Sequence, residues 1–478
     1  MRSISLLLCA ALAGSAAAQP LPDLGSAGDA ALSPQMERRI GESIVRDIRF
    51  REPSYLEDPE IADYLAGLGE RLAQATPGTR HDFEFFVMRD HTLNAFALPG
   101  GFVGVHTGLI SASETESELA SVLAHEIAHV TQRHIARMLG QQDQMQLPVL
   151  VALAAAVLLG RSRPDLAMGA AAAAQAGAVQ ATLAYSRDFE READRVGLAA
   201  LETAGFDARA MSAFFERMQR SMRVGDDGSM PGYLRTHPVT TERIADSQNK
   251  AAAMPYRQHL DSAEFHLVRA KLRADTGDAR EAVAHFEASV RERRYAAESA
   301  ARYGLTSALL RARRAREAEA QLKLARGAGA AGPMIETLAA RIKQAQGEHA
   351  AAARLLAEAR ERYPRSRPVL YSHLAALQES GGNARAAEQL GDAVRLHPRD
   401  ARLRALQAKS YAALGKRFLQ HQAQAEVYAL QGSLPAAIEQ LELARRSGDA
   451  DFYQLSVVDA RLKELRAQHA QETKDAKR

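Results

Sequence analysis

Two histidines and a glutamate stand at a spacing that could bind and use a metal ion. The run His125-Glu126-Ile127-Ala128-His129 has the H-E-x-x-H pattern, and imidazoles four residues apart lie about 40° apart around a helix and face the same way. Neutral imidazoles at this spacing can share one zinc ion. Glu126 then lies beside the ion without binding it, where its carboxylate can take a proton from an attacking water molecule.

The helix that carries this pattern is predicted to be buried. Residues 119–130 are apolar on nearly every face, which is typical of a helix inside a protein. An imidazole or carboxylate in such a helix needs a partner, and a metal ion is the simplest one; the alternative is a surface helix with two incidental histidines. Two capping boxes could start the helix: Ser113 with Glu116, or Thr115 with Glu118.

A catalytic zinc site needs a third protein ligand and one open position. A second helix is predicted from near Tyr185 to about Thr203, with Gly205 as its stop. Within it Glu190 and Asp194 share a face, so Glu190 could bind the zinc while Asp194 orients a histidine ligand. Spacing alone leaves open the alternative that this is an ordinary solvated face of carboxylates and arginines.

Four segments together resemble the zinc metallopeptidase family of CAAX prenyl proteases and heat-shock membrane proteases. They are N-A-F-A at 94–97, H-E-x-x-H at 125–129, E-x-x-A-D at 190–194, and T-H-P at 236–238 followed by Arg243-Ile244. The resemblance covers about residues 33–253. It implies one zinc ion per chain, Glu190 as the third ligand and Glu192 as a neighbour of the site.

A small predicted sheet offers a place for a peptide substrate. Residues 83–89 and 94–107 are predicted as strands, with Gly100-Gly101 between the two halves of the second. Proteases of this layout bind an extended peptide through main-chain hydrogen bonds to an exposed strand edge, and residues 94–98 are the predicted edge. The candidate substrate-binding residues are Asn94, Ala95, Phe96 and Ala97. A plain core hairpin is the alternative.

His237 is the second candidate catalytic residue beside Glu126. It precedes Pro238 in a predicted loop, and in the resembling family this histidine can approach the metal. Two hypotheses are open: His237 stabilises the developing oxyanion, or it fills the open position of the zinc and holds the protease off. A histidine that only caps the loop is a third. Three other histidines have no ligand spacing and are predicted not to bind the metal: His91, His106 and His134.

The N-terminus and the cysteine content predict export. Residues 1–18 have a short basic start, an apolar core and a run of alanines before the predicted cut, which is typical of a secretory signal peptide, and residues 19–32 form a predicted linker. Cys9 is the only cysteine, and Leu8 before it argues against lipid attachment. The mature chain can therefore form no disulfide and offer no thiolate to a metal. The formal net charge of +3 gives no reason to expect nucleic acid as a partner.

An apolar segment after the active-site helix needs a separate interpretation. Residues 147–160 form a run of about 14 residues, which is short of the roughly 20 that a membrane-spanning helix needs. Residues 166–184 are longer but rich in alanine and glycine. Both are predicted to pack on the catalytic domain or to form a mobile flap over the cleft. A peripheral contact of residues 147–184 with a membrane surface is the alternative.

The second half of the chain repeats with a period near 34 residues. Similar turn sequences begin at positions 277, 313, 347 and 382, at spacings of 36, 34 and 35, and Pro364 and Pro398 close two units. This period is typical of tetratricopeptide repeats, which stack into a curved solenoid with a concave binding surface. We expect four clear repeats, a break in the register near Gly415 and a less regular end.

The predicted fold class is mainly α. A gluzincin-type zinc peptidase domain of helices and a small sheet is expected over 33–254, an α-solenoid of tetratricopeptide repeats over 260–470, and a disordered tail over 471–478. An exported peptidase with such repeats resembles a family of periplasmic proteases of Gram-negative bacteria that act in outer-membrane protein quality control.

That resemblance implies the partners. They are unfolded or stalled outer-membrane β-barrel proteins, and the barrel assembly machinery, which the repeats would contact in the periplasm or at the outer membrane. Two alternatives come from other functional classes. One is a chaperone-like repeat scaffold whose zinc site is latched or structural, and the other is a general periplasmic housekeeping peptidase.

Overall fold

The computed structural model describes residues 32–78, 82–140, 187–224 and 232–475. The predicted signal peptide, most of the predicted linker and the apolar segment 147–184 lie outside the described residues. Within the described ranges, no helix combines the length and apolarity that crossing a bilayer requires.

Two N-terminal helices each begin with a polar cap residue followed by a proline. Helix α2 (Pro34–Arg51) follows Ser33 and helix α3 (Pro59–Ala75) follows Asp58, and in each case the polar side chain accepts a hydrogen bond from a backbone amide of the first turn. Proline fits the first helical position because the amide it lacks would have no partner there. Both helices pack against the sheet or its surroundings and so frame the domain that contains the candidate site.

A three-stranded sheet lies beside these helices, with the order β1-β3-β2. Strand β1 (Glu84–Met88) pairs parallel with β3 (Phe102–His106), and β2 (Ala95–Leu98) pairs antiparallel with β3. The predicted second strand is therefore a hairpin that turns at Gly100-Gly101, where both residues have positive φ. Strand β2 has no second strand neighbour in the described sheet, so it is an edge strand, as predicted.

The active-site pattern lies on a buried helix, as predicted. Helix α5 (Glu116–Thr131) has almost every side chain buried, and it packs against β2, α3 and α9. Thr115 caps it by accepting a hydrogen bond from the Glu118 amide. The alternative box from Ser113 and Glu116 does not form, because Ser113 ends helix α4 (Thr107–Ala112) and its hydroxyl donates to the Leu109 carbonyl.

The remaining helices of the N-terminal domain surround α5. They are α6 (His134–Gly140), α9 (Arg187–Ala204), α10 (Arg209–Val224), α11 (Gly232–Thr236) and α12 (Thr241–Ala253). Helix α9 ends at the predicted glycine, Gly205, which has φ of 78°. It crosses α5 closely at Gly197, where an added Cβ would lie 3.2 Å from the backbone nitrogen of His125. A glycine at the crossing lets the two ligand-bearing helices meet.

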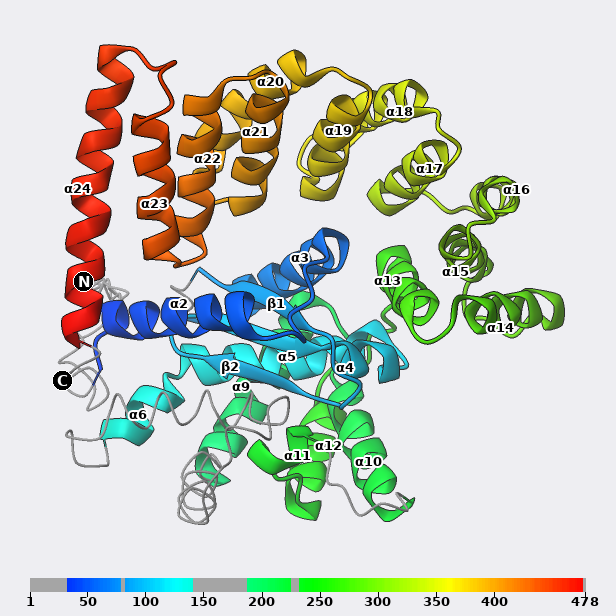
Figure 1. Cartoon of the computed structure of the whole chain (residues 1–478). Helices are drawn as coiled ribbons and strands as arrows, with labels where there is room; N and C mark the ends of the chain where they lie inside the picture. Colours follow the sequence, from blue (N-terminus) through cyan, green and yellow to red (C-terminus); the bar gives the residue numbers. More distant parts are fainter. Residues whose placement is uncertain (1–31, 79–81, 141–186, 225–231, 476–478) are drawn as a thin grey trace, which may run out of the picture.

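The C-terminal half is a stack of helical hairpins. The pairs are α13 (Ala263–Asp275) with α14 (Ala279–Glu292), α15 (Glu298–Arg311) with α16 (Ala315–Gly327), α17 (Pro333–Ala345) with α18 (His349–Arg362), α19 (Arg367–Glu379) with α20 (Asn383–Leu396), α21 (Ala401–Ala413) with α22 (Arg417–Leu430), and α23 (Leu434–Arg445) with α24 (Phe452–Asp475). Short turns join the two helices of each pair, and the pairs curve in an arc around the N-terminal domain (Figure 1).

Two details of the predicted repeats are wrong. The register does not break at Gly415, because the turn at Gly415 lies 34 residues after the turn at Gly381 and joins a fifth regular pair, α21 and α22. The next turn within a pair, at Gly448 between α23 and α24, follows 33 residues after Gly415, so the spacing continues, and Gly432 lies between α22 and α23. Residues 471–475 are not a disordered tail but the last turn of α24, where Glu472 pairs with Arg46 of α2 at 3.8 Å.

Helix α3 lies on the concave side of the arc of repeats, where α13 and α19 contact it (Figure 1). Lys271 of α13 is buried there, with its Nζ 2.5 Å from both Asp58 Oδ2 and Glu60 Oε2. The Thr337 hydroxyl of α17 also donates to Glu60. Burial lowers the pKa of Lys271, but the two carboxylates outweigh this and raise it, so the lysine is charged and locks the repeats to the peptidase domain.

Replacing Lys271 with methionine is expected to lower the free energy of unfolding by about 3–5 kcal/mol, because two buried carboxylates lose their cation. Urea unfolding of the two proteins measures this difference. Lys250, whose pair with Asp246 is partly exposed, provides the control, since Lys250→Met should change stability by about 0–1 kcal/mol. Equal effects of the two substitutions would contradict the buried lock.

Candidate metal centre

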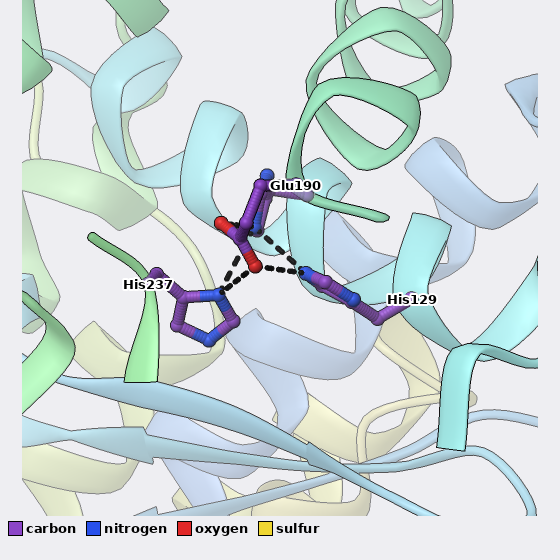
Figure 2. A group of neighbouring side chains, drawn as sticks. His129, Glu190 and His237 are labelled. Carbon is purple, nitrogen blue, oxygen red and sulfur yellow. Dashed lines mark hydrogen bonds and ion pairs between the residues drawn. The ribbon is translucent and has the colours of Figure 1, made fainter. Parts of the chain in front are cut away.

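Four side chains from three helices converge at one buried point. His125 and His129 come from α5, Glu190 comes from α9, and His237 directly follows α11. Each offers one donor atom, and these atoms all lie within 4.8 Å of one another. None of the four residues is more than 2 % exposed. Figure 2 shows the Glu190 carboxylate pointing between His129 and His237.

The two α5 histidines face the same way, as their spacing predicts. Their Nε2 atoms are 2.9 Å apart. The Glu190 carboxylate spans both rings, with Oε2 3.5 Å from His125 Nε2 and Oε1 3.4 Å from His129 Nε2. The alternative of a solvated acid–base face around Glu190 is therefore wrong, because its carboxylate turns inward to the histidines.

Asp194 lies behind His125, away from the point of convergence. Its Oδ1 is 3.0 Å from His125 Nδ1, and because an ionised carboxylate only accepts, the ring donates. Burial lowers the pKa of His125, but the hydrogen bonds to Asp194 and Glu190 outweigh it and raise the pKa to about 9. Asp194 thus holds the His125 ring with Nε2 toward Glu190, which is the orienting position that the sequence predicts.

Arg243 of α12 is a site residue whose role sequence reasoning missed. Its guanidinium donates from Nε and Nη2 to the two oxygens of Asp194, each at 2.8 Å, and Nη1 pairs with Glu190 Oε2 at 2.7 Å. Burial raises the pKa of Asp194, but Arg243 and His125 outweigh this and lower it. The sequence signal that could have identified Arg243 as a site residue was its place in one of the four segments that carry the family resemblance.

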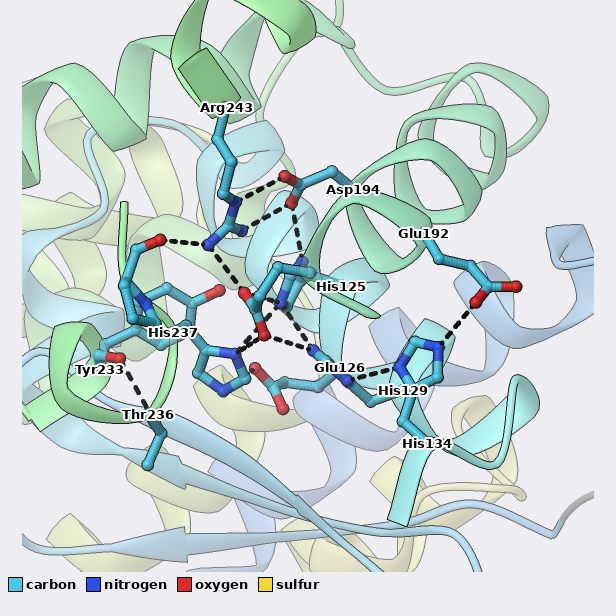
Figure 3. Close-up of polar contacts among 12 residues, drawn as sticks. His125, Glu126, His129, His134, Glu192, Asp194, Tyr233, Thr236, His237 and Arg243 are labelled. Atoms are coloured by element: carbon cyan, nitrogen blue, oxygen red, sulfur yellow. Dashed lines mark hydrogen bonds and ion pairs between the residues drawn. The ribbon is translucent and has the colours of Figure 1, made fainter. Parts of the chain in front are cut away.

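His237 lies inside the cluster rather than at its rim. Its Nδ1 is 3.0 Å from Glu190 Oε1 and 3.3 Å from His125 Nε2, while Nε2 is 3.5 Å from Glu126 Oε1. The Tyr233 ring stacks on it at 4.6 Å between centroids. Figure 3 shows the ring pointing from the end of α11 toward these side chains, so the hypothesis of a mere loop cap is wrong.

Glu126 lies beside the cluster and outside it. Its side chain is fully buried, and neither carboxylate oxygen has a hydrogen bond partner among the described residues. Burial therefore raises the pKa of Glu126, against the smaller opposing effects of His237 and His125. A buried carboxylate with a raised pKa can exchange a proton with a molecule bound next to it.

The donor atoms fit a zinc ion better than a hard cation. Three imidazole nitrogens and one carboxylate oxygen meet there, and zinc takes nitrogen and oxygen ligands in fours, whereas calcium and magnesium prefer all-oxygen sites. Two Nε2 atoms at 2.9 Å repel each other when both carry lone pairs, unless a cation or proton lies between them.

The candidate substrate-binding strand β2 passes next to the cluster. The His106 amide donates to the Asn94 carbonyl at 3.0 Å, so by antiparallel alternation the backbone groups of Ala95 and Ala97 point to the free edge. Ala97 lines a small pocket together with His129. The edge is not exposed in this state, because the four residues 94–97 are all buried and the Tyr233 amide of α11 donates to the Leu93 carbonyl.

Two of these strand residues have special environments. The Asn94 Oδ1 atom is buried without a hydrogen bond partner in the described part of the chain. Phe96 points away from the cluster and packs on Phe86 at 5.8 Å between ring centroids, within a core that includes α2 residues. Its side chain therefore belongs to the core, and its backbone faces Gly104 of β3 rather than the free edge.

The other histidines divide into two groups. His91 and His106 lie outside the cluster, as predicted, and His106 bonds to Thr92. His134 is not a member of the cluster either, but it contacts His129 with 2.8 Å between their Nδ1 atoms. This contact does not follow from helical spacing, because α5 ends before Arg133, which has φ of 53° and turns His134 back toward the site.

Comparisons with known proteins agree with this architecture. The sequence profile of peptidase family M48 matches residues 59–251. The chain is 32% identical to the β-barrel assembly-enhancing protease of Escherichia coli (strain K12) over 456 residues, which is 94% of this chain and 92% of that protein.

Two other relatives match over shorter stretches. A Vibrio cholerae protein provisionally given the same name is 40% identical over 252 residues, 53% of this chain and about half (51%) of its own length. A mitochondrial metalloendopeptidase, OMA1 of Schizosaccharomyces pombe, is 34% identical over 182 residues, 38% of this chain and 50% of its own length. The part shared with OMA1 is of the size of the peptidase domain.

Proposed function

Because the chain belongs to peptidase family M48 and to the β-barrel assembly-enhancing proteases, it is a metallopeptidase, and we propose that it is a zinc-dependent endopeptidase of the periplasm. Its substrates are outer-membrane β-barrel proteins whose assembly has stalled. The observation that carries the proposal is the buried cluster of His125, His129 and Glu190 next to the buried carboxylate of Glu126.

The residues divide the work of peptide hydrolysis between them. His125, His129 and Glu190 would hold the zinc ion, and Asp194 orients His125. The bound zinc would lower the pKa of a water molecule and polarise the scissile carbonyl. Glu126 takes the proton of the attacking water and passes it to the leaving amine. Burial strengthens these charge interactions because little water is present to screen them.

The substrate is proposed to bind as an extra strand on β2. The outward backbone groups of Ala95 and Ala97 offer main-chain hydrogen bonds to an extended peptide, which suits unfolded β-barrel segments with strand-forming sequences. Because α11 covers this edge through Tyr233, the peptide enters when α11 moves away. That motion would also carry His237 away from Glu190, so edge access and opening of the metal centre are proposed to occur together.

Replacing Asn94 with alanine is expected to lower kcat/KM about tenfold without lowering thermal stability. The Oδ1 atom has no partner among the described residues, so it is free to accept a peptide N–H, and one lost hydrogen bond costs about 1–1.5 kcal/mol. Peptide cleavage and thermal melting of the two proteins measure the two effects. A fall in stability with unchanged kcat/KM would make Asn94 a structural residue instead.

Two proposed roles remain for His237, and the contacts favour one. A side chain that bonds Glu190 and approaches Glu126 occupies the position that water and substrate would need, which favours a latch. The oxyanion role requires the ring to stay near the metal while the substrate is bound. The described state supports the latch because His237 is the fourth residue of the cluster and its Nδ1 lies 3.0 Å from Glu190 Oε1.

The assembly role is proposed from the relatives' name and from the repeats. The E. coli relative is named a β-barrel assembly-enhancing protease. The match to it covers 92% of that protein and 94% of this chain, so it includes the repeats. We propose that the repeats contact the barrel assembly machinery or its clients, that the protein promotes barrel assembly, and that the zinc site degrades barrels that stall. Export by residues 1–18 puts it in the periplasm, in reach of the outer membrane.

The test is zinc content together with client capture. We expect the mature chain to hold one zinc ion, to cleave casein, and, as the inactive Glu126→Gln variant, to retain barrel precursors and assembly factors from periplasmic extracts. Capture of arbitrary periplasmic proteins would support the housekeeping alternative. One zinc ion with client binding but no cleavage, even after removal of the His237 side chain, would support the repeat scaffold, and a chain without zinc would overturn the proposal.

A further inference from the structure

His134 lies next to His129, on the side of the ring that faces away from the metal cluster. His134 is fully buried, and its Nδ1 is 2.8 Å from His129 Nδ1. Its other nitrogen, Nε2, is 3.3 Å from Glu192 Oε2. Arg137 holds that same oxygen, with 2.8 Å from Nη1. The chain of contacts therefore runs from Arg137 through Glu192 and His134 to His129, and Figure 3 shows its part from Glu192 to His129.

The proton positions along this chain are fixed by what each group can donate. An ionised carboxylate only accepts, so the proton of neutral His134 lies on Nε2 and points to Glu192. His134 Nδ1 is then a lone pair, and the short contact requires His129 to donate from its own Nδ1. His129 is thereby left with a lone pair on Nε2, the atom that faces His125 and Glu190.

We infer that His134 is a positioning residue that fixes the tautomer and ring orientation of His129 for the metal. The inference rests on the proposed function, since it assigns a supporting group to the proposed zinc site. His134 accepts a hydrogen bond from His129 Nδ1, as Asp194 does from His125 Nδ1. The acceptor for His129 is a neutral imidazole instead of a carboxylate. Outer groups of this kind hold ligand histidines in many metal sites.

The surroundings of His134 hold its ring in one plane. Phe189 of α9 stacks on it at 4.6 Å between centroids and an interplanar angle of 14°. The Arg137 guanidinium lies 4.7 Å from the centre of that same Phe189 ring. Phe189 and Glu192 both belong to α9, the helix that carries Glu190, so one helix supplies a ligand of the cluster and the support for a ligand from another helix.

Zinc affinity of the full mature chain tests the inference by competition with a chromophoric chelator. His134→Leu removes the acceptor, and we expect the zinc dissociation constant to rise roughly 10- to 100-fold. His134→Asn keeps an oxygen acceptor near the Nδ1 position, so we expect a rise within about threefold, since the hydrogen bond from His129 is retained. His106→Leu, at another buried histidine of the same domain that lies outside the cluster, is the control and should leave zinc affinity unchanged.

The outcomes separate the inference from the function on which it rests. Unchanged zinc affinity in His134→Leu, or equal losses in the leucine and asparagine variants, would overturn the positioning role while leaving the zinc site intact. A mature chain that binds no zinc would overturn the proposed function and the inference with it. If His134→Leu does not fold, Glu192→Gln carries the test: we expect a severalfold weaker zinc affinity, and an unchanged one overturns the inference.

Discussion

Glu126→Gln is expected to keep one zinc ion per chain and to lower casein cleavage by roughly 10²- to 10⁴-fold, the range that a positioned general base contributes. Glutamine has the same shape but cannot accept the proton of the attacking water. The effect should fall on kcat rather than on KM, because Glu126 acts on the reacting water and not on the substrate's remote parts. Zinc analysis and steady-state cleavage measure the two quantities on the same preparation.

The matched control is Glu70→Gln, the same change at an exposed residue of α3. It should leave both zinc content and cleavage unchanged. Loss of zinc in Glu126→Gln would mean that Glu126 helps to hold the ion, and full cleavage would mean that another group is the base. In either case the assignment of Glu126 as a base that does not bind the ion would be wrong.

His237→Ala is expected to raise casein cleavage at least about tenfold, which is the gain if the latched state holds nine-tenths of the molecules or more. The ring bonds Glu190 and approaches Glu126 in the described state, so its removal opens the space for water and substrate. An oxyanion role predicts the opposite, a fall of roughly 10²- to 10³-fold. The sign of the change therefore decides between the two hypotheses.

Two further variants make this measurement decisive. His91→Ala changes an exposed histidine outside the cluster and should leave cleavage unchanged. The double variant with Glu126→Gln should lose the gained activity, because cleavage that is released by His237→Ala must still use the same base. Activity that survives in the double variant would come from another site or from a contaminating protease.

Local patterns predicted the parts of the site that depend on one helix. The spacing of His125 and His129 fixes their common direction, and the apolar run around them predicts burial, because both follow from helical geometry alone. Glu190 needed the family resemblance, since its inward direction depends on the crossing of α9 and α5 at Gly197. Crossing geometry is a tertiary property that no local pattern of charges reveals.

The errors have equally specific causes. His134 was correctly predicted not to be a ligand, but its contact with His129 was not foreseen, because the backbone at Arg133 takes a left-handed conformation that few residues other than glycine adopt. The fifth repeat pair was missed because the turn at Gly415 lacks the alanine spacing of the earlier turns. The pairing of Lys271 with Asp58 joins residues of two domains, and contacts between domains depend on how the solenoid curves.

The position of helix α3 on the concave side of the repeats links two equilibria. A partner that docks on that face must compete with a helix of the same chain, so its observed affinity is the intrinsic affinity reduced by the free energy needed to part the two domains. Weakening the lock at Lys271 would then strengthen partner binding, and a bound partner would loosen the peptidase domain from the solenoid. The ion pairs of the buried Lys271 thus set the free energy that partner binding has to supply to separate the two domains.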